Sequence, residues 1–396
     1  MSPAPLLFDA SHTSHTAAQT GIQRVVRTFF SELSGRQATL PICYDPHLIG
    51  WRALRPDEIA VLRDQTGGAG RSRGARWTLA QKLSGAGRRW LGRRPTLPAA
   101  AGLICPELFS AKVGSRLPEL LARVPCPRVA IFYDAIPLKF PELTPAGTVA
   151  RFPAYLRELL VFDGVAAISE DSAASLRDFW QWLGITNPPP VHALPLAIDE
   201  SHTGSSPAIQ DPAKTPRILC VCTIEGRKNH LALLEACETL WREGLAFELQ
   251  LIGMARADTA AAALARIGEL QQAGRPLLFK GSVPEAELHA AYRECAFTVY
   301  PSLIEGFGMP VLESLQHGKP CVCSALGALG ESARGGGCVP LEIVNAPTLA
   351  QAIRRLLQQP AELATLAAAA RQRHLKTWPE YTSEFTAWMQ SLPRRG

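Results

Sequence analysis

The sequence lacks the features of a membrane-spanning, disordered or secreted protein. No window holds about 18 uninterrupted apolar residues, so we expect no transmembrane helix. The opening MSPAPLLFDA has no basic start, so we expect no signal peptide and a cytoplasmic location. Only 19% of the residues are charged and 47% are hydrophobic, a balance typical of a globular chain, and 396 residues suffice for two domains.

The sequence has ten cysteines, but they do not follow the spacing of zinc or redox motifs. The close pairs Cys220/Cys222 and Cys321/Cys323 have one intervening residue, not two, and no histidine cluster accompanies them. Both pairs fall in apolar runs typical of buried strands, where cysteine packs as a small apolar side chain. We therefore expect buried, reduced thiols.

The net charge of +6 is modest, but basic residues gather in one stretch, 63–94, where Asp64 is the only acid. Its internal basic residues are Arg71, Arg73, Arg76, Lys82, Arg88, Arg89 and Arg93, interleaved with Trp77, Leu79, Leu83, Trp90 and Leu91. Such a stretch could lie on an anionic membrane surface, which would make the protein peripheral on the inner face of the plasma membrane. The alternative is a solvated, partly disordered insertion. Nucleic acid is a weaker option, because no nucleic-acid module accompanies the patch, and we expect no such partner.

The C-terminal half predicts short buried strands alternating with helices, which is typical of a parallel, doubly wound α/β sheet. Strands are expected at 217–222, 247–252, 276–279, 297–300 and 320–323. Helices are expected at 230–241, up to about 272, from a capping box at 282–285 to about 295, after 310 and at 349–357.

The N-terminal half repeats this alternation less regularly. Strands are expected at 6–8, 127–132 and 164–168, and helices at 21–33 and 169–178. The segment 201–216 is rich in Ser, Thr, Pro and Gly and reads as a linker. We expect an N-terminal domain over 1–205 that contains the basic insertion, a C-terminal domain over 206–375, and a helix within 376–396 that packs back on the first domain.

Two acidic residues flank a glycine-containing bend between a strand and a helix, in the run 301–313. Pro310 suits the first helical position, which leaves Glu305 in the loop and Glu313 about one turn inside the helix. The amides expected at the positive end of this helix are those of Gly306, Phe307 and Gly308. Amides that bind anions, beside carboxylates that bind sugar hydroxyls, indicate a sugar-nucleotide site.

At these residues the sequence resembles a known family. The segments 300–315, with its E-x7-E motif, and 223–230 resemble the retaining GT-B glycosyltransferases of the group 1 or family-4 type, as do 318–320 and 327–331. The resemblance covers about 217–357. In the N-terminal half, 20–24 and 133–137 are similar to stretches in members that build bacterial surface polysaccharides. The resemblance implies two Rossmann-like domains facing a central cleft, where the loops near Gly21, Arg227 and Glu305 would converge.

The resemblance also implies roles for individual residues. Arg227 and Lys228, at the start of the helix after Cys222, would hold the diphosphate of the donor and neutralise the charge that develops as it leaves. Glu305 would contact hydroxyls of the transferred sugar, and Glu313 the ribose of the nucleotide. The bend at Gly306, Phe307 and Gly308 would present amides to sugar or phosphate, and Gly21 would let the backbone approach the diphosphate.

Two positions depart from the family pattern. Many members carry His-Asp where this chain has Tyr133 and Asp134; Asp134 would contact acceptor or donor, or else cap the following turn. Many relatives have Gly-Arg at the positions of Val221 and Cys222, so Arg227 would have to supply that missing charge alone. His12 and His15 are expected in a polar surface loop instead of the cleft.

The sequence thus predicts a retaining hexosyltransferase that moves a mannose- or rhamnose-type sugar from a nucleotide-sugar to a growing glycan, with a lipid-linked acceptor as one option. No Asp-x-Asp motif is present, so we expect metal-independent transfer without a cofactor. Two alternatives remain: a GT-B sugar-nucleotide epimerase, and a non-catalytic sugar-nucleotide-binding scaffold of a polysaccharide assembly complex.

Overall fold

The computed structural model describes residues 4–18, 21–64, 74–92, 95–125, 127–199, 215–256 and 259–393. The chain divides into two compact units. The N-terminal unit comprises Met1–Leu196 and Trp378–Gly396, and the C-terminal unit comprises Ala197–Thr377. The sequence placed the boundary near 205, and most of its linker, 201–214, lies outside the described residues.

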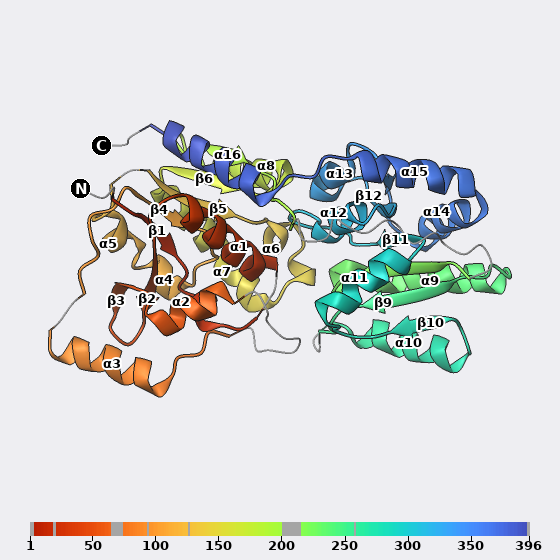
Figure 1. Ribbon diagram of the computed structural model, residues 1–396, viewed down its shortest axis with the longest axis horizontal. Helices are drawn as coiled ribbons and strands as arrows, with labels where there is room; N and C mark the ends of the chain where they lie inside the picture. Colours follow the sequence, from red (N-terminus) through yellow and green to blue (C-terminus); the bar gives the residue numbers. More distant parts are fainter. Residues whose placement is uncertain are drawn as a thin grey trace. The chain divides into compact units, whose positions relative to one another are not determined.

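The N-terminal unit is built on a seven-stranded sheet of order β3-β2-β1-β4-β5-β6-β7 (Figure 1). Its strands are β1 (Leu6–Asp9), β2 (Thr39–Asp45), β3 (Gly50–Ala53), β4 (Gly102–Cys105), β5 (Arg128–Phe132), β6 (Gly164–Ala167) and β7 (Val191–Ala193). All neighbours pair in parallel except β3, which forms an antiparallel edge against β2.

Helices connect these strands. They are α1 (Gly21–Arg36), α2 (Pro56–Arg63), α3 (Leu79–Trp90), α4 (Ala111–Gly114), α5 (Leu117–Leu121), α6 (Ile136–Lys139), α7 (Ala146–Glu158), α8 (Glu170–Trp182) and α16 (Trp378–Ser391), with 3-10 turns η1 (Thr13–His15), η2 (Pro141–Leu143) and η3 (Leu159–Val161). The chain returns to this unit through α16, where Tyr381 and Phe385 pack on Phe29 of α1 with ring centroids 5.4 and 4.9 Å away.

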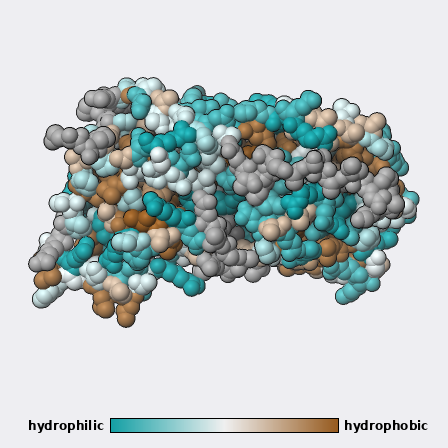
Figure 2. Space-filling view, viewed as in Figure 1, coloured by the Kyte–Doolittle hydropathy of each residue, from teal (hydrophilic) through white to brown (hydrophobic). Residues whose placement is uncertain are grey.

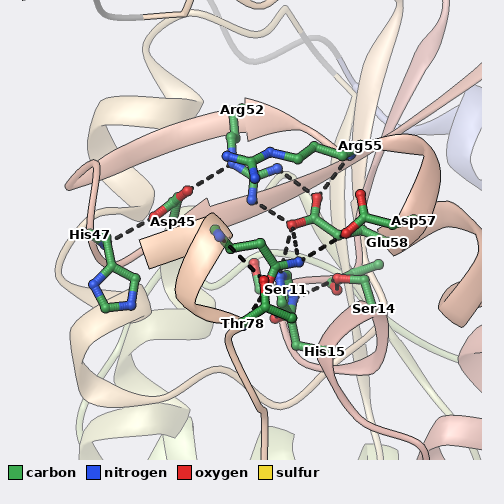
Figure 3. A network of polar contacts seen from close by, with 12 residues as sticks. Ser11, Ser14, His15, Asp45, His47, Arg52, Arg55, Asp57, Glu58 and Thr78 are labelled. Atoms are coloured by element: carbon green, nitrogen blue, oxygen red, sulfur yellow. Dashed lines mark hydrogen bonds and ion pairs between the residues drawn. The ribbon is translucent and has the colours of Figure 1, made fainter. Parts of the chain in front are cut away.

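The described part of the basic stretch contains the helix α3, which a buried polar network fixes to the unit (Figure 3). Glu58 accepts hydrogen bonds from both terminal nitrogens of Arg52 at 2.6 Å, from His15 at 3.1 Å and from Gln81 of α3 at 3.1 Å. Burial would raise the pKa of Glu58, but Arg52 and His15 hold it well below its usual range. Trp77, which precedes α3, stacks on His15 at 3.8 Å.

The C-terminal unit has a fully parallel six-stranded sheet of order β10-β9-β8-β11-β12-β13. Its strands are β8 (Arg217–Val221), β9 (Glu248–Ile252), β10 (Leu277–Phe279), β11 (Phe297–Tyr300), β12 (Cys321–Ser324) and β13 (Cys338–Leu341). Its helices are α9 (His230–Arg242), α10 (Ala261–Gln272), α11 (Glu285–Glu294), α12 (Met309–Gln316), α13 (Gly327–Ala333), α14 (Ala346–Gln358) and α15 (Pro360–Gln372), with the 3-10 turn η4 (Gly226–Lys228).

The two sheets confirm the predicted fold class, because each is a doubly wound, almost wholly parallel sheet with helical connections. In each sheet the chain adds strands first toward one edge and then toward the other. The change, called the switch point, falls between β1 and β4 in the first sheet and between β8 and β11 in the second. Ligands of such sheets bind at the carboxyl ends of the strands at this switch point. In the described part of the chain, no helix combines the length and apolar character needed to cross a bilayer.

Candidate functional site

The switch point of the C-terminal sheet brings together the two predicted loops. Strands β8 and β11 are neighbours, and the loop that follows β8 carries Arg227 and Lys228, while the loop that follows β11 carries Glu305. The backbones also join, since the amide of Leu303 donates to the carbonyl of Arg227 at 2.9 Å. The fold therefore brings Glu305 into contact with Lys228 and Arg227, which lie 77 and 78 positions earlier in the sequence.

Glu305 lies at the centre of this site, with its side chain only 10% exposed. Its Oε2 accepts from Nη1 of Arg227 at 2.7 Å, and its Oε1 forms an ion pair with Nζ of Lys228. The hydroxyl of Tyr300, at the end of β11, donates to Oε1 at 2.9 Å, and the hydroxyl of Ser302 donates to the same atom. Each carboxylate oxygen is thus held by a cation, and one of them also by two hydroxyls.

The charges of this cluster stabilise one another. Burial would raise the pKa of Glu305, but Lys228 and Arg227 lower it to about 2. Burial would likewise lower the pKa of Arg227, but Glu305 and Glu225 raise it. Burial holds the pKa of Tyr300 well above its usual value, with Glu305 adding to the effect. At neutral pH Glu305 is therefore ionised and the hydroxyl of Tyr300 is neutral.

A second carboxylate orients Arg227 from the other side. Glu225 pairs with Nη2 of Arg227 at 2.8 Å and with Nη1 of Arg256 at 3.5 Å. Arg256 follows β9, so a third strand end contributes a cation. The side chains of Arg227 and Arg256 are 23% and 29% exposed, whereas that of Lys228 is 8% exposed. The two arginines are therefore the cations that an anion from solvent reaches first.

The structure corrects the predicted place of the two basic residues. Arg227 and Lys228 lie in the 3-10 turn η4, and α9 begins only at His230, after Asn229. Asn229 has a φ of 54°, a left-handed conformation that bends the chain between turn and helix. The bend separates Arg227 and Lys228 from the first turn of α9, so they are not residues of that helix.

The bend after Glu305 has the predicted form. Gly308 caps α12 with a φ of 109°, and a Cβ at this position would lie 2.9 Å from the side chain of Leu329. Phe307 is buried, and its carbonyl accepts from Ser332 at 2.7 Å. The helix begins at Met309, so Pro310 is its second residue, not its first.

Glu313 and Gly306 complete the predicted motif. Glu313 lies in α12 as expected, is half-buried, and its Oε2 accepts from the hydroxyl of Tyr292 at 3.1 Å. Gly306 is buried in the bend itself. The structure thus gives both residues defined places in the C-terminal unit, and their contacts with a ligand remain predictions.

Three predicted site residues belong to the N-terminal unit. Tyr133 is buried, and its hydroxyl donates to the carbonyl of Pro106 at 2.7 Å. Asp134 accepts from the amide of Ile136 at 3.0 Å, the turn-capping contact that the sequence left open. Gly21 begins α1, and a Cβ there would meet nothing within 4 Å, so local packing does not require a glycine.

The switch point of the N-terminal sheet holds two buried carboxyl groups that sequence reasoning missed. Glu107 follows β4 and accepts from the amides of His12 and Thr13, each at 2.7 Å. Burial and the charge of Glu107 raise the pKa of Asp9, the last residue of β1, to about 7. The loop after β1 is thus tied into the unit, and the expectation of a surface loop is wrong for His15, which is buried against Glu58.

The sequence analysis did not predict four further residues of this site, namely Tyr300, Ser302, Glu225 and Arg256. Tyr300 and Ser302 lie inside the segment that carries the resemblance, so their position next to Glu305 was a usable signal. Arg256 had a weaker one, since a basic residue shortly after a buried strand lies near the ligand-binding edge.

The comparisons with known proteins agree with this geometry. Residues 215–359 match the family described as "Glycosyl transferases group 1". Over 336 residues the chain is 24% identical to the serotype-specific mannosyltransferase WbdA of Escherichia coli, covering 80% of this chain and 38% of that protein. The chain thus spans well under half the length of this relative. These matches confirm the resemblance, and the family model places it at residues 215–359.

Solved structures match the whole fold. Sucrose-phosphate synthase from Thermosynechococcus elongatus aligns with a TM-score of 0.66 at 19% identity, over 98% of this chain and 99% of that one. Anabaena HepE in complex with UDP and glucose aligns with a TM-score of 0.67 at 14% identity, over 98% and 100%. These neighbours are GT-B glycosyltransferases, so the fold is GT-B.

Proposed function

We propose that this chain is a nucleotide-sugar-dependent glycosyltransferase. The observation that carries the proposal is the buried cluster of Glu305 with Arg227 and Lys228 at the switch point of a group 1 domain. A donor brings a diphosphate, which needs cations, and a sugar, which needs hydrogen-bond acceptors. The cluster offers both within one contiguous set of side chains.

The diphosphate is assigned to Arg227, with Lys228 behind it. Arg227 is partly exposed and already oriented by Glu225 and Glu305, so little side-chain freedom is lost when a phosphate binds. Lys228 is nearly buried, and its charge reaches a bound phosphate through the low-dielectric interior. Both cations stabilise the negative charge that grows on the leaving diphosphate.

The sugar is assigned to Glu305. Its low pKa keeps it ionised, so it accepts hydrogen bonds from sugar hydroxyls. We assign the ribose to Glu313, and amide contacts to Gly306, Phe307 and Gly308. The acceptor hydroxyl attacks the anomeric carbon on the face from which the diphosphate leaves, and the departing phosphate takes the proton of that hydroxyl. This same-face transfer retains the anomeric configuration and uses no metal ion.

The transferred sugar is proposed to be a hexose of the mannose type, for a growing polysaccharide. The support is the relative WbdA, named a serotype-specific mannosyltransferase. The nucleotide donor is supported by HepE structures that hold UDP or UDP-glucose. A deoxyhexose such as rhamnose stays as the second donor class.

One substitution separates transfer from the other candidate functions. Glu305→Ala should abolish release of nucleoside diphosphate from the correct nucleotide-sugar in the presence of acceptor, because the sugar loses its anionic contact. A scaffold would still support glycan assembly with Glu305→Ala. An epimerase would yield an altered nucleotide-sugar with no glycan extended. Either result would reject the transferase proposal.

A second part of the proposal concerns α3, which we assign to an anionic membrane surface. Leu79, Leu83 and Trp90 are 72%, 64% and 87% exposed and lie on one face of the helix, opposite the side that Gln81 and Gly85 bury. Figure 2 shows hydrophobic residues gathered over the part of the molecule where Figure 1 draws α3.

The basic residues of this segment fit the same partner. Arg76, Lys82, Arg88 and Arg89 are exposed, so cations flank an exposed apolar stripe, the arrangement of helices that lie in a headgroup region. Arg71, Arg73, Arg93 and Arg94 lie outside the described residues. A peripheral position would bring the enzyme to a lipid-linked acceptor.

Vesicle binding tests this assignment. Trp90→Ser should weaken binding to vesicles that contain anionic lipid, and added salt should weaken it further. Trp182→Ser is the matched control, because Trp182 is 79% exposed on α8 of the same unit. Equal binding by the two variants, or binding that salt does not affect, would reject the membrane proposal. Binding to RNA in place of vesicles would reject it as well.

A further inference from the structure

A cluster of two thiols and one imidazole lies directly beside the candidate site. Cys220 and Cys222 share one face of the chain at the end of β8, and their sulfur atoms are 3.7 Å apart. Nε2 of His230, the first residue of α9, lies 3.4 Å from Sγ of Cys222. All three ligand atoms lie within 4.8 Å of one another, and all three residues are buried.

These separations match the edges of a tetrahedral metal site. Zn–S bonds of about 2.3 Å and Zn–N bonds of about 2.0–2.1 Å place two sulfurs about 3.8 Å apart and a sulfur and a nitrogen about 3.5 Å apart. The observed 3.7 and 3.4 Å agree with both values. We infer that Cys220, Cys222 and His230 form a binding site for one thiophilic divalent cation of the zinc type.

The surroundings of the imidazole support this inference. His230 is 3% exposed, and its Nε2 contacts the thiol of Cys222, which is a weak hydrogen-bond partner. Nε2 is therefore the ring nitrogen that a cation bound to Cys222 would reach. Nδ1 of the same ring does not face the thiols and has no hydrogen-bond partner among the described residues.

The release of protons balances the charge when the metal binds. The cation would form bonds to two thiolates and one neutral imidazole, and the thiol protons of Cys220 and Cys222 would leave to solvent. A solvent oxygen supplies the fourth ligand, as in zinc sites with three protein ligands. No oxidant or reductant is needed.

A second cluster of potential metal ligands lies in the N-terminal unit, but its carboxylate already pairs with an arginine. His15, Cys43 and Glu58 also lie within 4.8 Å of one another, but Glu58 already accepts from both terminal nitrogens of Arg52. The buried guanidinium neutralises the carboxylate and would repel a cation. Among the described residues, only the cluster of Cys220, Cys222 and His230 combines the distances of a metal site with ligand atoms that do not already pair with a cationic side chain.

The position of the site suggests what the metal does. Cys222 precedes and His230 follows the segment 223–229, which carries Arg227 and Lys228. A cation bound to both ends would fix the loop that we assign to the diphosphate. It would not touch the donor, so metal binding can be measured whether or not the proposed transfer is correct.

Cobalt binding to the reduced, chelator-treated full-length protein tests the inference. One Co²⁺ per chain should produce a thiolate-to-cobalt charge-transfer band and tetrahedral d–d bands, and Zn²⁺ should remove both. Cys222→Ser and His230→Gln should each weaken Co²⁺ binding at least tenfold. Cys237→Ser is the matched control, since Cys237 is a buried free thiol on α9 outside the cluster, and it should bind as the unsubstituted protein does.

Thiol protection in the unsubstituted protein covers the case in which a variant does not fold. Zinc should protect Cys220 and Cys222 from alkylation under mild urea, as read by mass spectrometry of their peptide, and leave Cys237 unprotected. Octahedral cobalt spectra, equal loss in Cys237→Ser and Cys222→Ser, or alkylation of Cys220 and Cys222 that zinc does not change would overturn the inference.

Discussion

Replacing Glu305 with glutamine removes the one anion between Arg227 and Lys228 and keeps its size. The carboxyl pKa is lowered from 4.5 to about 2 by these two cations, against the effect of burial. At about 1.4 kcal/mol per pKa unit, this lowering corresponds to about 3 kcal/mol of stability at neutral pH. Breaking a buried ion pair typically costs about 3–5 kcal/mol, which agrees.

The sign of the pH dependence follows from the direction of the pKa change. Because the pKa is lower in the folded state, the stabilisation is complete above pH ~4.5 and is lost as the pH falls toward about 2. We therefore expect Glu305→Gln to lower the free energy of unfolding by about 3 kcal/mol at pH 7 and by roughly half as much at pH 3.

Urea unfolding followed by circular dichroism measures both values. Glu235→Gln is the control, because Glu235 pairs with Arg266 at an exposed site, where an ion pair contributes at most about 1 kcal/mol. A Glu305→Gln variant as stable as Glu235→Gln at pH 7 would refute the reasoning. So would a difference that stays constant from pH 7 to pH 3.

Four further substitutions have defined expected effects on the fold. Gly308→Ala should destabilise the protein by about 1–3 kcal/mol, because φ is 109° and the methyl group would clash. Gly21→Ala should be neutral or stabilise the protein by up to about 1 kcal/mol, because a Cβ there meets nothing. Equal thermal midpoints of the two variants would contradict this expectation. Tyr133→Phe should cost about 1 kcal/mol through its lost hydrogen bond to Pro106 and leave nucleotide affinity unchanged, so a weakened affinity in titration calorimetry would place Tyr133 at the donor instead. Arg52→Met should cost about 3–5 kcal/mol in urea unfolding, because it removes the guanidinium that pairs with the buried carboxylates of Asp45 and Glu58. A loss below about 1 kcal/mol would contradict the network.

The sequence predicted the C-terminal unit well because its signals are local. The strand at 217–222 and the helix from 230 follow from apolar periodicity, and the structure has β8 at Arg217–Val221 and α9 at His230–Arg242. The bend at Gly308 was predicted in the same way, since glycine before a helix that carries proline at its start marks a strand-to-helix turn.

Other features needed the tertiary structure. The left-handed Asn229 turns the chain so that His230 meets Cys220 and Cys222, and spacing rules for metal motifs do not include such a turn. His15 looked polar and exposed in sequence, yet Trp77 stacks on it from a segment more than sixty residues away.

The N-terminal strands were harder to predict, and β2, β3, β4 and β7 were missed. β4 has only four residues, Gly102–Cys105, after a segment rich in Pro and Ala, so no periodicity could develop. Central parallel strands are apolar on both faces, which leaves short ones indistinguishable from helix segments. The sheet order, not the local sequence, identifies them.

Nucleotide binding tests the central claim most directly, that Arg227 and Glu305 form a diphosphate-sugar site. Purified protein is titrated with UDP, GDP, ADP and dTDP, and Arg227→Gln is compared with Arg266→Gln, since Arg266 is a partly exposed arginine of α10 in the same unit. We predict that one nucleotide binds and raises the thermal midpoint, that Arg227→Gln loses at least tenfold in affinity, about 1.4 kcal/mol, and that Arg266→Gln loses none. No binding by any of the four, or equal binding by both variants, would contradict the account.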